Sequence, residues 1–199
     1  MALRHLVPAI ALALTACAAP LQSFTDLERA RIDEYERAAR QVLESRGIKG
    51  PPPAVRIGED PALAAMARPA AYFTPRTGFG DLGRPGRIMI NRAVVADDLI
   101  AQAVLSHELA HFVLGHGDGR CQSHRHECEV EANVASVELL MTGWDLDYSD
   151  AVRLQYAYLK SVVLAVRREE TIPSGAAGDP CRELEDFAAR FKTSSAACD

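Results

Sequence analysis

The residues best suited to chemistry lie between Leu105 and Cys128, a stretch that holds five of the chain's six histidines. In the segment His107-Glu108-Leu109-Ala110-His111, two histidines are separated by four positions and a glutamate follows the first. Residues four apart lie on one face of an α-helix, about one turn apart, so both imidazoles can reach one zinc ion. The glutamate between them is placed to take a proton from a water activated by the metal. The spacing predicts a hydrolytic zinc site, with His107 and His111 as ligands and Glu108 as general base.

A third ligand is expected on the helix that follows, because a catalytic zinc commonly takes three protein ligands and keeps a fourth position for water. The candidates are Glu127, Glu129 and Glu131. Glu127 lies at the start of the predicted helix, and Glu131 is rotated by about 200° from Glu129, which predicts a solvated charge. Asn133 is four residues after Glu129 on the same side. We therefore expect Glu129 to bind a single zinc and Asn133 to hydrogen-bond a ligand histidine.

The other histidines of the stretch are expected to lie outside this site. His116 is five residues beyond the second histidine of the motif, which turns it about 140° away from the ligand face of the helix. His124 and His126 stand between Cys121 and Cys128. Two thiolates and two imidazoles at this spacing could hold a second, structural zinc. In an exported chain, however, a disulfide between the two cysteines is favoured, and it would restrain the helix that carries the third ligand.

The N-terminus indicates export. Arg4 precedes an apolar run over residues 6–14, which is too short for a membrane span of about 20 residues and is typical of a secretory signal. The run ends in Leu14-Thr15-Ala16-Cys17, which resembles the cleavage site of bacterial lipoproteins. Residues 1–16 are then a signal peptide and Cys17 carries the lipid anchor; an ordinary signal peptide cut near Ala18 or Ala19 is the alternative. The first reading predicts a protein of the bacterial cell envelope, anchored in the outer membrane and facing the periplasm.

Four cysteines remain in the mature chain, an even number that suggests two disulfides with three possible pairings. The pairings with the shortest loops are Cys121 with Cys128 and Cys181 with Cys198. The net charge of −5 is modest and spread along the chain, so nothing indicates a nucleic-acid partner. At 199 residues, 48% hydrophobic and 25% charged, the chain fits one domain.

The pattern of elements predicts an α+β domain over residues 25–199, after a tether over residues 17–24. Thr25-Asp26-Leu27-Glu28 has the form of a capping box, and the helix that it begins ends at Gly47. Three short runs then predict a small antiparallel sheet, and four helical segments follow. The strands are expected at Ala54–Ile57, Ala70–Thr74 and Arg87–Asn91, and the helices from Asp97, at Glu127–Thr142, at Ser149–Arg168 and at Cys181–Phe191.

The segment "SHELAHFVLGH" and the later "EVEANVASVELLMTGWDLDYSDAVRL" resemble the gluzincin metallopeptidases related to HtpX, the Oma-type protease, the CAAX prenyl endopeptidases and BepA. In that group an HExxH helix precedes an E-x-x-x-D helix and a G-[YF]-[DN] turn. Glu129 matches the glutamate, Gly143-Trp144-Asp145 stands at the turn, and Asn133 replaces the aspartate. The "EAN" sequence is also similar to the metallopeptidases of the ImmA and IrrE type, most of which are cytoplasmic.

The HtpX-type resemblance implies a minimal catalytic domain that hydrolyses peptide bonds in envelope proteins, with zinc as cofactor and a protein or peptide as substrate. It also implies that an edge strand near Ile88–Asn91 holds the substrate by strand addition. Tyr148, Arg153 and Tyr156 are candidates for stabilising the oxyanion. The alternative from another class is a chaperone-like zinc lipoprotein that binds misfolded or outer-membrane proteins. The intact Glu108 favours the enzyme, because a binding module has no need of a general base.

Overall fold

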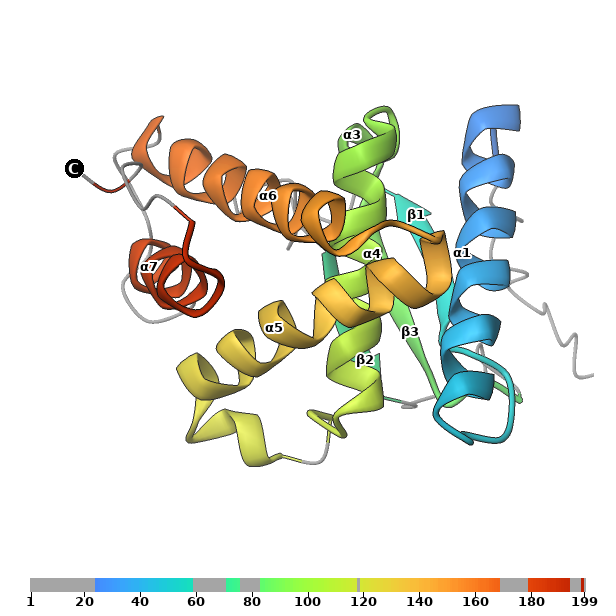
Figure 1. Ribbon diagram of the computed structural model, residues 1–199. Helices are drawn as coiled ribbons and strands as arrows, with labels where there is room; N and C mark the ends of the chain where they lie inside the picture. The colour runs from blue at the N-terminus through green and yellow to red at the C-terminus, as the bar shows by residue number, and fades with distance from the viewer. Residues whose placement is uncertain are drawn as a thin grey trace, which may run out of the picture.

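The computed structural model describes residues 24–58, 71–75, 83–117, 119–168, 179–193 and 198. The predicted signal peptide, the lipidation site at Cys17 and most of the tether lie outside these residues. No helix among the described residues is long and apolar enough to span a membrane. The elements follow in the order α1 (Asp26–Ser45), β1 (Ala54–Gly58), β2 (Ala71–Pro75), β3 (Gly86–Asn91), α3 (Arg92–Val95), α4 (Asp98–Val113), the 3-10 turn η2 (Arg120–Gln122), α5 (Arg125–Trp144), α6 (Tyr148–Arg168) and α7 (Pro180–Phe191). The α+β class and the predicted order of elements are confirmed (Figure 1).

Helices α1, α4 and α7 begin where a side chain can satisfy their exposed backbone amides. At α1 the predicted capping box forms, because the Thr25 hydroxyl accepts from the Glu28 amide at 3.2 Å and the Glu28 carboxylate accepts from the Thr25 amide at 2.8 Å. Asp97 caps α4 by accepting from the Ile100 amide, and Asp179 caps α7. These caps fix the residue at which each helix starts. In α4, the start at Asp98 determines which helix face carries the HExxH side chains.

The sheet is mixed and not antiparallel as predicted. Its order is β1-β3-β2, with β3 parallel to β1 and antiparallel to β2. Alternation of apolar side chains predicts which face of a strand meets the core, and Ile88 and Ile90 are buried as this pattern predicts. The same alternation occurs in parallel and antiparallel strands, so it could not show the strand direction. Because β3 is central, the free edge nearest α4 belongs to β2.

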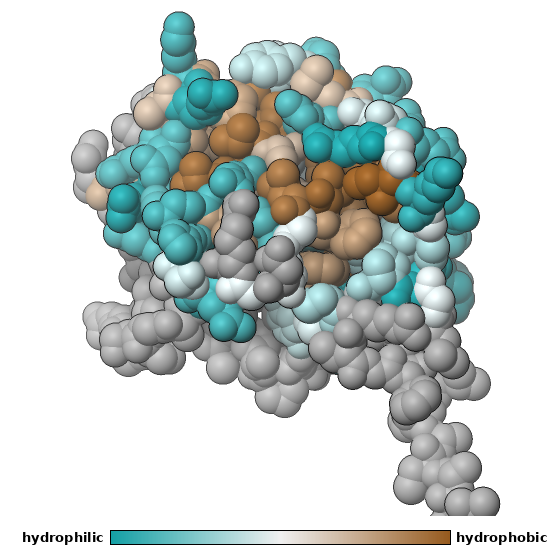
Figure 2. Space-filling model, turned by 90° about the horizontal axis from the view of Figure 1, so that it is seen from below, coloured by the Kyte–Doolittle hydropathy of each residue, from teal (hydrophilic) through white to brown (hydrophobic). Residues whose placement is uncertain are grey.

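Helix α4 lies in the middle of the molecule, between the sheet and the helices α5 and α6 (Figure 1). It is buried on most sides, from Ala103 to Ala110, which includes His107 and Glu108. Leu109 and Ala110 are fully buried in the core that α1, α5 and α6 complete. On the face shown in Figure 2, the described residues form an apolar area that is surrounded by hydrophilic side chains. The predicted catalytic motif is therefore carried by the most enclosed helix of the fold.

Helix α5 is held close to α1 at its C-terminal end. Gly143 lies against Ala38, and a Cβ at position 143 would come within 3.1 Å of the Ala38 Cβ and carbonyl oxygen. The helix ends at Trp144, and its C-cap Asp145 has a positive φ of 56°. Gly143 thus allows α5 and α1 to pack closely. This packing fixes the position of α5, which carries Glu129.

Candidate metal centre

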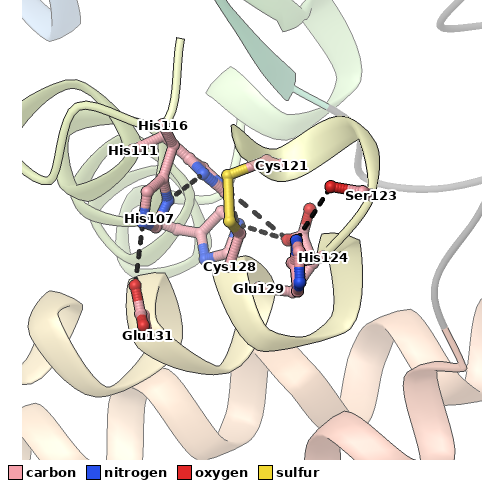
Figure 3. Close-up of a disulfide and its surroundings, with 9 residues drawn as sticks. All are labelled: His107, His111, His116, Cys121, Ser123, His124, Cys128, Glu129 and Glu131. Atoms are coloured by element: carbon pink, nitrogen blue, oxygen red, sulfur yellow. Dashed lines mark hydrogen bonds and ion pairs between the residues drawn. A yellow bond between two sulfur atoms is a disulfide. The ribbon is translucent and has the colours of Figure 1, made fainter. Parts of the chain in front are cut away.

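Three side chains from two helices converge on one point. His107 and His111 on α4 bring their Nε2 atoms to 3.0 Å, and the Glu129 carboxylate on α5 lies 3.1 Å from the first and 3.5 Å from the second. All three ligand atoms lie within 4.8 Å of one another. The structure therefore brings together all three residues that the sequence predicted as ligands (Figure 3).

This triangle has the dimensions that a zinc ion requires. With zinc bonds of about 2.0–2.1 Å to nitrogen and oxygen, tetrahedral ligand atoms are separated by about 3.3 Å. The observed separations of 3.0, 3.1 and 3.5 Å lie on both sides of that value. Two imidazoles and one carboxylate are also the ligand set of several catalytic zinc sites. The residues present thus fit a zinc ion in both distance and chemistry.

Glu108 links the metal-binding helix to the sheet. Its side chain is buried at 5% exposure, and it accepts a hydrogen bond from the backbone amide of Phe73 on β2. Burial raises the pKa of Glu108, while the positive charges that His107 and His111 carry when protonated oppose that rise. A carboxylate with a raised pKa holds a proton more readily, which suits the general base that the sequence predicted.

The two ligands from different helices form a strongly coupled pair when no metal is bound. Burial lowers the pKa of His107, but the hydrogen bond and the charge of Glu129, together with Glu108 and Glu183, outweigh it and raise that pKa to about 9. Burial raises the pKa of Glu129, but hydrogen bonds from His107 and His111 hold it well below its usual value. Negative charge thus dominates the site, which favours a cation between these groups.

His116, expected to leave the ligand face, contacts the ligand His111. Their Nδ1 atoms lie 2.9 Å apart, and His116 Nε2 is 3.1 Å from the Glu131 carboxylate (Figure 3). A metal on His111 Nε2 requires a proton on His111 Nδ1, so His111 donates to His116, which in turn donates to Glu131 through Nε2. The prediction that His116 turns away from the ligand face is wrong, because His116 contacts His111. Glu131 is exposed, as expected of a solvated charge, and it bonds His116 from the surface.

The position of His116 is explained by the way α4 ends. Gly115 adopts a left-handed conformation with φ of 72°, which turns the chain back on the helix. The amide of Gly115 donates to Phe112 and the amide of His116 donates to His111, the paired bonds of a Schellman motif. The predicted rotation of about 140° between His111 and His116 assumed that the helix continues to position 116. That prediction fails because the helix ends at Val113.

Asn133 does not have its predicted role. Its Oδ1 accepts a hydrogen bond of 3.1 Å from Gln155 on α6, and its Nδ2 is buried without a hydrogen-bond partner among the described residues. His107 Nδ1 likewise has no such partner in that part of the chain. Because Asn133 faces α6, it ties α5 to α6 and does not bond a ligand histidine.

One of the two predicted disulfides forms. Cys121 and Cys128 are bonded, which connects η2 to the first turn of α5, next to Glu129. Cys181 and Cys198 are not joined. Cys181 lies in the first turn of α7, and Cys198 lies beyond the C-terminal end of that helix.

A cleft of about 650 Å³ opens beside these ligands. Strand β2 forms one wall through Tyr72 and Phe73, and α6 contributes Tyr158, whose ring centroid is 5.9 Å from that of His107. The cleft is lined by neither Tyr148 nor Arg153, which are exposed. Helix α7 adds Glu183 to the wall. Tyr158 was missed because the tyrosines at 156 and 158 differ by about 200° around a helix, and only packing shows which one faces α4.

Comparison with known proteins gives one family. The model of peptidase M78, the IrrE N-terminal-like domain, matches residues 63–172, which is more than half of the 199 residues. The matched segment contains the three converging ligands, Glu108 and Tyr158. Neither the curated proteins nor the solved structures contain a match. The match confirms the similarity to metallopeptidases of the IrrE type, whereas the resemblance to the HtpX, BepA and Oma group stays a prediction.

Proposed function

The chain belongs to the M78 peptidase family of IrrE N-terminal-like domains, and we propose that it is a zinc-dependent endopeptidase acting on proteins of the bacterial cell envelope. The observation that carries this proposal is the convergence of His107, His111 and Glu129 beside the buried Glu108. A zinc ion on these three residues would supply Lewis acidity to a water molecule and to a peptide carbonyl.

Glu108 moves the proton in this proposal. Its carboxylate takes a proton from the attacking water and then delivers it to the amide nitrogen of the leaving segment. Burial favours the protonated form of Glu108, so the proton is held until the amine leaves. The amide of Phe73 keeps the carboxylate in place. We assign to the Tyr158 hydroxyl the donation of a hydrogen bond to the substrate carbonyl, since this side chain lies beside His107.

The substrate would bind as an extended strand along β2. Strand β3 is paired on both sides, so the edge near Ile88–Asn91 that the sequence suggested has no free backbone groups to offer. Strand β2 pairs with another strand on one side only within the described sheet, and Ala71, Tyr72, Phe73 and Pro75 line the cleft. The Phe73 amide is already bonded to Glu108, so the substrate would use other backbone groups of this strand. Strand addition uses backbone groups, so it makes weak demands on the substrate sequence.

We also propose that the protein is anchored to the outer membrane by a lipid on Cys17, after removal of residues 1–16. The short apolar run before Cys17 supports this placement. Labelling of cells with radioactive palmitate tests it. Label on the wild-type protein and none on a Cys17→Ser variant is the expected result, and an unlabelled wild type would refute the anchor.

The decisive experiment for the enzyme compares the purified chain with the variants Glu108→Gln and Glu127→Gln. We expect the wild type to hold one zinc ion and to cleave casein, with the cleavage abolished by a chelator and restored by zinc. Glu108→Gln should keep the zinc and lose at least about 100-fold in kcat, the usual magnitude for a general base. Glu127 is exposed in the first turn of α5, so Glu127→Gln should cleave like the wild type.

Cleavage that persists in Glu108→Gln would refute the assigned role. A wild type that binds zinc and unfolded outer-membrane proteins without cleaving them would favour the chaperone-like alternative, in which Glu108 is dispensable. The lipid anchor is tested by the palmitate labelling, separately from the zinc site.

A further inference from the structure

A second group of potential metal ligands lies next to the first. A ring nitrogen of His116 and the sulfur atoms of Cys121 and Cys128 all lie within 4.8 Å of one another (Figure 3). His116 and Cys128 are buried, and Cys121 is partly buried. In the structure the two sulfurs form a disulfide, so this group cannot bind a metal in its present state.

We propose that reduction of this disulfide creates a second zinc site formed by Cys121, Cys128 and His116. A dithiol reductant gives two electrons and two protons to the Cys121–Cys128 bond and becomes a disulfide itself. Zinc binding then releases the two protons from the thiols, because the thiolate is the ligand. The disulfide and the second metal ion are mutually exclusive states of one sulfur pair.

The geometry requires only small movements. In a tetrahedral site with zinc–sulfur bonds of about 2.3 Å, the two sulfurs lie about 3.8 Å apart and each lies about 3.6 Å from the nitrogen. The present separations, within 4.8 Å, therefore need changes of about 1–2 Å. Cys121 lies in the 3-10 turn η2 and Cys128 in the first turn of α5, and neither belongs to the main hydrophobic core, so such adjustments leave that core in place.

His116 couples the second site to the first. Its Nε2 donates to Glu131, so Nδ1 holds the lone pair, which the structure uses to accept from His111. A metal on Nδ1 would take that lone pair and deprive His111 of its partner. The Glu131 carboxylate would then support a metal-bound imidazole of the second site. Reduction with metal uptake should thus weaken the first site.

The histidines between the two cysteines do not belong to this group. His124 Nδ1 contacts the Ser123 hydroxyl at 2.8 Å, and His126 Nε2 contacts Asp186 on α7 at 2.9 Å. The two-cysteine, two-histidine site that the sequence suggested is therefore not assembled. The histidine that meets the sulfurs is His116, which reaches them because Gly115 reverses the chain.

The test counts metal ions in both redox states of the full-length chain, purified in detergent. Cys17, Cys181 and Cys198 are replaced by serine, so that Cys121 and Cys128 are the only cysteines left. The oxidised chain and the phosphine-reduced chain are each titrated with cobalt(II), and the thiolate-to-cobalt charge-transfer absorption is recorded. We expect one ion and no charge-transfer band when oxidised, and two ions with the band when reduced.

Two variants identify the nitrogen ligand in the reduced state. His116→Ala should lose the second ion or bind it about tenfold or more weakly, with a diminished charge-transfer band. The control variant with His124→Ala and His126→Ala should bind two ions as before. One ion in both redox states, or loss of the band in the control but not in His116→Ala, would overturn the proposal. None of these readouts uses peptidase activity, so the result is independent of the proposed function.

Discussion

His111 and His116 are joined through their Nδ1 atoms at 2.9 Å, and His116 extends the contact to Glu131 at 3.1 Å. The pair places a hydrogen-bond acceptor behind a metal ligand, which fixes the tautomer of His111 with its Nε2 lone pair toward His107 and Glu129. Because the Glu131 carboxylate accepts from His116, which accepts from His111, the His111 imidazole becomes a better electron-pair donor to a cation.

His116→Ala is therefore expected to lower zinc affinity by about 10–100-fold, the range found when groups behind metal ligands are removed. Competition with a chelating dye on the oxidised chain measures the affinity. His124→Ala is the matched control, because His124 is exposed and bonds only its neighbour Ser123 in the described contacts. Equal affinities for wild type and His116→Ala would show that the contact does not support the site.

Two glutamates of α5 offer a second comparison. Glu129 contacts His107 and His111 directly, whereas Glu131 contacts His116, which is not among the three converging ligands. Glu129→Gln removes a charged ligand and should abolish stoichiometric zinc binding at micromolar concentrations, while Glu131→Gln should cost about tenfold in affinity. Zinc content after dialysis separates the two outcomes. Identical zinc contents for both variants would contradict the assignment of Glu129 as the third ligand.

The sequence was sufficient for the features that depend on local spacing. The HExxH helix and the capping box at Thr25 follow from helical periodicity and cap chemistry. Glu129 was chosen through its spacing to Asn133, and the structure places Glu129 at the site although Asn133 bonds Gln155 instead of a histidine. The bond between Cys121 and Cys128 was predicted from the short loop between them together with the expectation of export. These patterns are set by residues near one another in the chain, and a single sequence displays them.

The features that were missed depend on contacts across the fold. His116 returns to His111 only because α4 ends in a left-handed Gly115, which spacing along an ideal helix cannot express. Asn133 turns to α6 because Gln155 offers a buried partner there. The alternation of side chains also does not show that β3 pairs with strands on both sides, which leaves β2 at the edge of the described sheet.

Tyr158 provides a test of transition-state stabilisation in the proposed enzyme. Its side chain is 8% exposed and lies beside His107 at the cleft wall. Tyr158→Phe keeps the ring and should lower kcat by about 10²–10³-fold with little change in KM or zinc content. Tyr156→Phe is the control on the same helix, because Tyr156 does not line the cleft. A kcat equal to that of the wild type would remove Tyr158 from the mechanism.

The stability of the metal-free chain should fall as pH rises through the range from about 6.5 to about 9. In the folded chain, Glu129, Glu108 and Glu183 together raise the pKa of His107 from 6.5 to about 9, against the effect of burial. A group whose pKa is raised by folding contributes stability that is fully present below its unfolded pKa and is lost as pH rises through its folded pKa. Glu108, whose pKa burial also raises, acts in the same direction, while Glu129 acts oppositely but only in acid, below its usual value.

The contribution of His107 is on the order of 3 kcal/mol for a shift of this size. Urea unfolding of the chelator-treated chain at pH 6 and at pH 9.5 measures it, and the midpoint should be lower at the higher pH. Saturating zinc displaces the proton from His107 at both pH values, so the zinc-bound chain should not lose stability in this way. Glu129→Gln removes the main partner of His107 and should flatten the pH dependence of the metal-free chain. A midpoint that rises toward pH 9.5 in the metal-free wild type would contradict the coupling between His107 and Glu129.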